Sequence, residues 1–118
     1  MDLHVSLAKF DDQLMCAGCG GNSGVSYLHH RCVEVHERAE DEEYVRLTRV
    51  RGSSVTSELV PSKGSGNPSD RRNGVRIAFD CELCQRKYWL NFAQHKGQTF
   101  IYWTPILEEP PTLSASSG

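Results

Sequence analysis

Apolar and polar residues alternate in several short stretches of the chain, which is the pattern of half-buried β-strands. In the clearest stretch, Val75, Ile77 and Phe79 alternate with neighbours that are polar or small. The same period, or a composition rich in β-branched and aromatic residues, predicts further strands over residues 27–36, 44–50, 55–60, 88–92 and 99–103. The pattern therefore predicts a mainly β fold built on one antiparallel sheet.

Turn residues separate these stretches. Gly52-Ser53-Ser54 predicts a hairpin turn that joins residues 44–50 to residues 55–60, and His95-Lys96-Gly97 predicts a second short hairpin loop. Residues 61–74 contain three glycines, two prolines, three serines and two asparagines, with no apolar side chain to bury. We therefore expect a long solvated surface loop there, inserted into the sheet together with the first hairpin.

The two ends of the chain follow different patterns. Leu3, Leu7 and Phe10 fall at helical spacing, whereas Leu3, Val5 and Leu7 suit a strand. Residues 1–13 are therefore interpreted as a short helix or an extended arm packed on the sheet. Residues 14–104 form the β domain, and the Pro- and Ser-rich residues 105–118 are expected to form a flexible tail.

Composition narrows the class of protein. The chain has 118 residues, of which 38% are hydrophobic and 24% charged, as in an ordinary single-domain globular protein. No apolar run reaches the roughly 20 residues that a membrane-spanning helix needs, and the first residues lack the basic and apolar pattern of a signal peptide. We therefore expect a soluble, cytoplasmic protein with no membrane partner.

Charge is distributed unevenly along the chain. The net charge is only −2, but residues 1–43 carry three basic and nine acidic groups, whereas residues 44–104 carry ten basic and four acidic groups. A net charge this small does not indicate a general polyanion binder, but its distribution is more informative. It gives the second half of the chain a basic character that suits an acidic partner surface.

Five cysteines are the strongest chemical signal. In a reducing cytosol they point to metal ligation or redox chemistry rather than to structural disulfides. Cys16-Ala17-Gly18-Cys19 and Cys81-Glu82-Leu83-Cys84 each place two sulfurs at the spacing of one edge of a zinc tetrahedron, and small residues follow Cys19. We therefore predict one structural Zn²⁺ held by Cys16, Cys19, Cys81 and Cys84.

Other interpretations of the cysteines and histidines remain. One alternative is a redox Cys-x-x-Cys motif, which would have its first cysteine at a helix N-terminus. The glycines after Cys19 disfavour such a helix. A second alternative is a pair of disulfides, which a reducing cytosol disfavours. Cys32 has no partner at metal spacing and is interpreted as a small buried hydrophobe. His29 and His30 are expected to point to opposite faces of a strand. His36 and His95 are interpreted as polar surface residues at strand ends.

Five motifs of the chain bear on its family: Cys16-x-x-Cys19-Gly20-Gly21, Tyr27-Leu28-His29-His30, the run from Gly64 to Gly74, Phe79-x-Cys81-Glu82-x-Cys84, and Gln94-His95-Lys96-Gly97. Through these motifs, residues 14–104 resemble small uncharacterised zinc-ribbon proteins of bacteria and their phages or other mobile elements. The resemblance implies a zinc-ribbon-like sheet in a bacterial or mobile-element setting, and it implies no settled activity.

The loop is the best candidate for contact with a partner. Exposed backbone amides beside two guanidinium groups suit a phosphate or a carboxylate, and the candidate residues are Lys63, Asn67, Arg71 and Arg72. The alternative is a solvated loop whose arginines pair with Asp70 or Glu58.

A closed four-cysteine shell leaves no coordination position for substrate, so we expect a binding role and no enzymatic activity. The first hypothesis is a protein-interaction module, either an adaptor or a phage-borne inhibitor of a host defence system. The second is a nucleic-acid binder that uses Arg46, Arg49, Arg71, Arg72, Arg76, Arg86 and Lys87. A small zinc or Cys/His enzyme is the third, and no catalytic motif supports it. No small-molecule substrate is expected.

Overall fold

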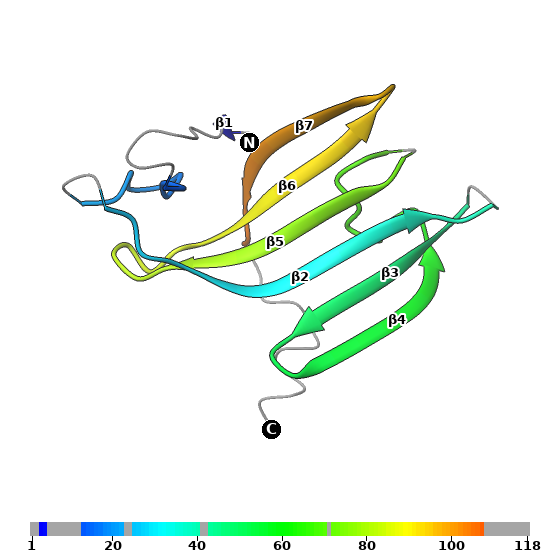
Figure 1. Ribbon diagram of the computed structural model, residues 1–118, viewed down its shortest axis with the longest axis horizontal. Helices are drawn as coiled ribbons and strands as arrows, with labels where there is room; N and C mark the ends of the chain where they lie inside the picture. Colours follow the sequence, from blue (N-terminus) through cyan, green and yellow to red (C-terminus); the bar gives the residue numbers. More distant parts are fainter. Residues whose placement is uncertain (1–2, 5–12, 23–24, 41–42, 71, 108–118) are drawn as a thin grey trace.

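The computed structural model describes residues 3–4, 13–22, 25–40, 43–70 and 72–107, and these form one antiparallel sheet. Its strands are β1 (Leu3–His4), β2 (Leu28–Arg38), β3 (Tyr44–Arg51), β4 (Ser54–Pro61), β5 (Gly74–Cys81), β6 (Lys87–His95) and β7 (Gln98–Pro105). Their order across the sheet is β1-β7-β6-β5-β2-β3-β4, with β4 at one edge (Figure 1). The mainly β, antiparallel fold is confirmed.

Both predicted hairpins are present. Arg51 pairs with Ser54 across a two-residue turn in which Gly52 has φ = 59°. His95 pairs with Gln98 across Lys96 and Gly97, whose φ angles are 50° and 80°. A positive φ at the first central position, or at both, is what a tight hairpin turn requires. Glycine at these turns therefore fixes the register of β3 with β4 and of β6 with β7.

A β-bulge in β2 decides which of its side chains share a face. The pairing of β2 with β5 shifts between His30 and Cys32, so that Arg31 is the extra residue. Because side chains alternate along a strand, this insertion moves Cys32 onto the face opposite to that of His30.

The register gives the sheet two different faces. Residues opposite each other on antiparallel strands share a face. One face, which we call the apolar face, carries Val33, Val35, Val50, Val55, Leu59, Val75, Ile77, Phe92 and Ile101. The other, which we call the ion-pair face, carries Cys32, Glu34, His36, Leu47, Arg49, Arg76, Trp89 and Asn91.

The aromatic core lies at the end of the sheet where β5 finishes and β6 begins. Trp103 is 1% exposed and meets the rings of Phe79 and Tyr88 edge to face, with centroids 5.8 Å and 6.0 Å away. Leu14 and Cys16 pack against the same cluster. The segment before β2 therefore covers this end of the sheet.

The loop between β4 and β5 is packed rather than solvated at its centre. Ser69 is 6% exposed and donates a hydrogen bond to the carbonyl of Gln94 at 2.7 Å. The Tyr102 hydroxyl donates to the carbonyl of Pro68 at 3.1 Å, and Gly66 lies against the Arg76 guanidinium. The expectation of a solvated loop is wrong at Ser69, because hydrogen bonds hold this part of the loop against β6 and β7.

The expected helix or arm at the N-terminus falls mostly outside the described residues, which exclude 1–2 and 5–12. Leu3 and His4 form a short strand that pairs with Trp103 and Tyr102 of β7. The predicted flexible tail also lies outside them from residue 108 onward. Within the described part of the chain, no helix is long and apolar enough to span a membrane.

Candidate metal centre

The two Cys-x-x-Cys segments fold into similar turns. In the first, the amide of Gly20 donates to the carbonyl of Cys16 at 2.9 Å, and in the second the amide of Gln85 donates to the carbonyl of Cys81 at 2.7 Å. The residue after the second cysteine has a positive φ in both turns, 71° at Gly20 and 59° at Gln85. The two turns thus share the same closing hydrogen bond and the same left-handed residue after the second cysteine.

The sheet brings the two turns together. Cys81 ends β5 and pairs with Leu28 at the start of β2, close behind the first turn. The amide of Cys16 donates to Ser26 Oγ at 3.0 Å, and the amide of Glu82 donates to the carbonyl of Tyr27 at 2.9 Å. Ser26 and Tyr27, just before β2, are therefore the short segment to which both cysteine turns are hydrogen-bonded.

The four sulfurs have the spacing of a metal tetrahedron. Those of Cys16, Cys19, Cys81 and Cys84 all lie within 4.8 Å of one another. The Cys16–Cys84 and Cys19–Cys81 sulfur separations are 3.8 Å and 3.6 Å. Zinc–sulfur bonds of about 2.3 Å at tetrahedral angles place sulfurs about 3.8 Å apart. The predicted ligand set is therefore assembled, and the donor set fits a tetrahedrally coordinated metal ion.

Burial and backbone amides set the thiol acidities in opposite directions. Burial raises the pKa of Cys16 to about 12, partly offset by hydrogen bonds from the amides of Cys19 and Gly18. Burial also raises the pKa of Cys84. At Cys81, burial acts in the same direction, but hydrogen bonds from the Cys84 amide and the Cys16 thiol outweigh it and lower the pKa to about 7. A metal that needs four thiolates must therefore displace protons from these thiols.

The centre and the core are one packed unit. Cys16 and Cys81 are 3% and 1% exposed and belong to the cluster of Tyr88, Leu90 and Trp103. A Cβ atom at Gly18 would lie 2.1 Å from the Tyr88 hydroxyl oxygen, so only glycine fits inside this turn. Metal binding and core packing therefore stabilise the same end of the sheet.

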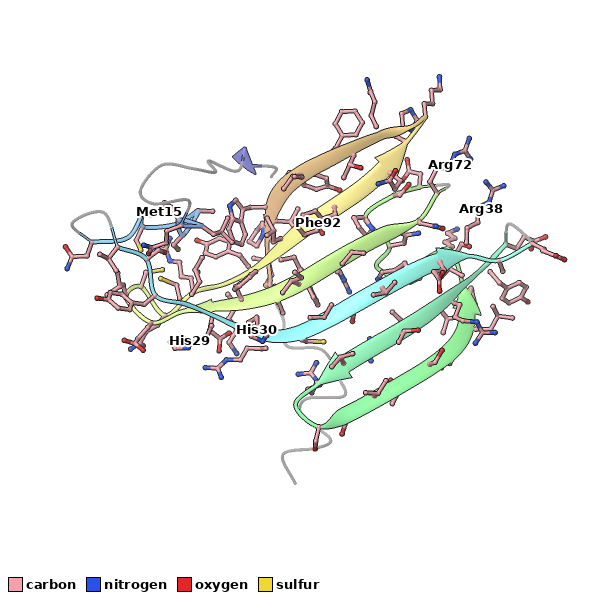
Figure 2. The ribbon with its side chains drawn as sticks, viewed as in Figure 1. Met15, His29, His30, Arg38, Arg72 and Phe92 are labelled. Carbon is pink, nitrogen blue, oxygen red and sulfur yellow. The ribbon has the colours of Figure 1, made fainter. Side chains whose placement is uncertain are left out.

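Among the described residues, the four-cysteine group is the one cluster of three or more His, Cys, Asp or Glu side chains able to hold a metal. Cys32 is 1% exposed, as its interpretation as a buried hydrophobe requires, and burial raises its pKa. His29 and His30 are both exposed on the early part of β2 (Figure 2). His29 Nε2 lies 3.0 Å from Glu82 Oε1, so that ring faces a carboxylate.

The interpretation of His36 as a surface residue is wrong. His36 is 0% exposed and lies on the ion-pair face, where its Nε2 is 3.3 Å from Glu34 Oε1. Its Nδ1 has no hydrogen-bond partner among the described residues.

Glu34 joins a buried ion-pair network that the sequence did not reveal. It is 1% exposed, and it accepts hydrogen bonds from Arg76 Nε at 2.7 Å and from Arg49 Nε at 2.8 Å. The Arg76 guanidinium also lies 3.8 Å from the centroid of the Trp89 ring. Burial raises the pKa of Glu34, but the His36 hydrogen bond and the charges of the two arginines outweigh it and lower the pKa to about 2. Glu34 is therefore charged in the folded protein.

Arg72, one of the residues predicted to contact a partner, lies far from the metal centre (Figure 2). Arg72 is at the end of the sheet opposite to Met15, which precedes the first cysteine turn (Figure 2). Asn67 is used within the loop, accepting from the amide of Ser69 and donating to the carbonyl of Arg72. Lys63 is exposed, and Arg71 lies outside the described residues. Contact with a partner through this loop stays a prediction.

Searches of protein-family models, of curated proteins and of solved structures each returned no match. The assignment of the centre therefore depends on the sulfur geometry and the donor chemistry.

Proposed function

We propose that this chain is a zinc-stabilised, non-catalytic module that binds another protein. The observation that carries the proposal is the apolar face, a row of aliphatic and aromatic side chains that the described strands leave partly open to solvent.

Zinc is the metal that best suits the centre. Four thiolates at tetrahedral spacing are a common structural zinc site, and cysteine-rich sites select soft or borderline metals over Mg²⁺ and Ca²⁺. When all four sulfurs bind, the shell is closed to water and substrate, which supports a structural rather than a catalytic role. Elsewhere among the described residues, the buried thiol of Cys32 has a raised pKa, which is unsuited to a nucleophile.

The apolar face supports protein binding. Val33, Val35, Val75 and Ile77 occupy its middle and are only partly buried, although they lie in central strands. Toward the β4 edge, Val50 and Val55 are 38% and 66% exposed. Contiguous exposed apolar side chains on a sheet mark interaction surfaces. An adaptor, or an inhibitor carried by a phage or mobile element, needs no more than such a surface.

The arrangement of the arginines favours a protein over a nucleic acid as the binding partner. Arg49 and Arg76 are engaged with Glu34, and Arg31 is engaged with Asp80 at 2.6 Å. Arg46 projects from the face opposite to that of Arg49, since the two are separated by an odd number of positions on β3. These four arginines therefore do not line one stripe that could follow a phosphate backbone.

The test compares two substitutions on opposite faces. Metal-loaded protein is used to capture partners from a bacterial lysate treated with nuclease, and binding to random DNA and RNA is measured in parallel over a range of salt concentrations. Val50→Glu on the apolar face is expected to reduce protein capture at least about tenfold, a loss of about 1.4 kcal/mol. Phe100→Glu, which changes a side chain 48% exposed on the ion-pair face, serves as the matched control and should not reduce it.

Two results would contradict the proposal. One is that the protein captures no other protein from the lysate but binds DNA or RNA in a salt-dependent way. The other is equal protein capture by the parent and Val50→Glu.

A further inference from the structure

Strand β4 is an edge strand without the usual protection against pairing. It is eight residues long, and all of them except Val60 are exposed. Its register with β3 runs without a shift from the Tyr44–Pro61 pair to the Arg51–Ser54 pair. Natural edges are commonly shortened, bulged, or blocked by lysine or an internal proline. Here the single charged residue is Glu58, and proline occurs only at the last position.

The hairpin determines which backbone groups of β4 point outward. Arg51 and Ser54 flank a two-residue turn, and residues in that position form a hydrogen-bonded pair. The N–H and C=O of Ser54 therefore face β3. Because this direction alternates along a strand, the corresponding groups of Val55, Ser57 and Leu59 face away from the sheet, where no described strand pairs with them.

We propose that β4 pairs antiparallel with β4 of a second copy of this chain, around a two-fold axis at Ser57. In this register Ser57 lies opposite Ser57 of the second copy, and Val55 of each copy lies opposite Leu59 of the other. The two-fold axis thus gives three outward-facing pairs, which exchange about six backbone hydrogen bonds. A two-fold axis through an antiparallel pair is perpendicular to the sheet, so the apolar faces of both copies lie on the same side.

The side chains are self-complementary in this register. Val55 and Leu59 are 66% and 52% exposed, and they meet twice across the axis on the apolar face. Glu58 then lies opposite Thr56, whose hydroxyl can donate to the carboxylate. Moving the register by two residues in one direction places Glu58 opposite Glu58, a repulsive pair. Moving it in the other direction separates Val55 from Leu59.

The interface is small, so the dimer should dissociate on dilution. It does not depend on the partner proposed above, although it would join two apolar faces into one surface. Sedimentation velocity of the metal-loaded full chain, from about 1 μM to about 1 mM, should show monomer converting to dimer. Ser57→Lys and Ser57→Asp should each be monomeric, because like charges face each other across the axis. An equimolar mixture of the two variants should dimerise.

Thr99→Lys is the matched control, because Thr99 is exposed on β7, which lies toward the edge of the sheet opposite to β4. It should dimerise like the parent. Hydrogen exchange on the unaltered chain gives a readout without substitution, since the amides of Val55, Ser57 and Leu59 should exchange more slowly as concentration rises. A chain that is monomeric throughout would overturn the proposal. A dimer that survives Ser57→Lys, or a mixture that stays monomeric, would also overturn it.

Discussion

The sulfur of Cys16 lies 3.8 Å from the sulfur of Cys84, although the two residues are 68 positions apart in the chain. The separation matches one edge of a tetrahedral four-thiolate site. The strands β2 to β5 lie between the two cysteine turns in sequence, and the pairing of Leu28 with Cys81 brings the turns together. Metal binding thus joins the two ends of the segment that forms strands β2 to β5.

The first prediction concerns the ligands. Cys81→Ser should lose the metal and unfold the protein, because structural zinc contributes about 10–16 kcal/mol in small peptides, comparable to the total stability of a domain. Metal content and thermal melting measure this. Cys32→Ala, which alters a buried cysteine outside the centre, should keep one metal per chain. A Cys81→Ser protein that melts like the parent would contradict the assignment.

The second prediction concerns the space inside the first turn. Gly18→Ala should destabilise the fold by about 1–3 kcal/mol, because its Cβ would lie 2.1 Å from Tyr88 Oη. Denaturant unfolding measures the cost. In a Tyr88→Phe background the same substitution should cost less, since the clashing oxygen is gone. An equal cost in both backgrounds would show that the hydroxyl contact is not the cause.

The third prediction concerns the buried carboxylate. Glu34→Gln should lower the free energy of unfolding by about 3 kcal/mol at pH 7, because Arg49 and Arg76 lose their counter-ion. The pKa of Glu34 falls from its ordinary value of 4.5 to about 2 in the folded state. A lowered pKa stabilises the fold above the unfolded pKa, and this contribution is lost as pH falls toward the folded pKa.

The difference between parent and Glu34→Gln should therefore be constant above about pH 4.5 and shrink below it. The comparison is made from about pH 8 down to about pH 5, because acid displaces the metal below that range and the metal-free protein is expected to unfold. Glu58→Gln, at an exposed position of β4, should change stability by less than about 0.5 kcal/mol. A difference that already shrinks as pH falls from about 8 to about 5 would show that the pKa of Glu34 is raised rather than lowered, so that Glu34 is not held as a carboxylate.

The fourth prediction concerns the loop between β4 and β5. Ser69→Ala should cost about 1–3 kcal/mol, because the Gln94 carbonyl and the Arg72 amide lose their bonds to the Ser69 hydroxyl. Ser53→Ala in the exposed β3–β4 turn is the control and should be nearly neutral. Equal melting temperatures for both variants would show that the loop is a solvated connector, as its sequence suggests.

Local sequence signals were sufficient for the strands and the turns. The alternation of Val75, Ile77 and Phe79 and the glycines at positions 52 and 97 depend on neighbours in the chain, so they identify β5 and two hairpins. The cysteine pairs identify the ligands because zinc constrains their spacing directly.

Features set by long-range pairing could not be predicted in the same way. The bulge at Arg31 exists only relative to β5, and it decides that Glu34 and His36 face Arg76 rather than solvent. Charged residues in strands are usually exposed, so their burial had no local signal. The one available hint was the odd spacing of Glu34 from Val33 and Val35, which places it on the face opposite to the apolar residues.

X-ray absorption at the zinc edge of the protein as purified measures the metal and its ligands together. We expect one zinc per chain with four sulfur neighbours at about 2.3 Å and no nitrogen or oxygen ligand. Well-folded protein without zinc, or a first shell that contains nitrogen or oxygen, would contradict this expectation.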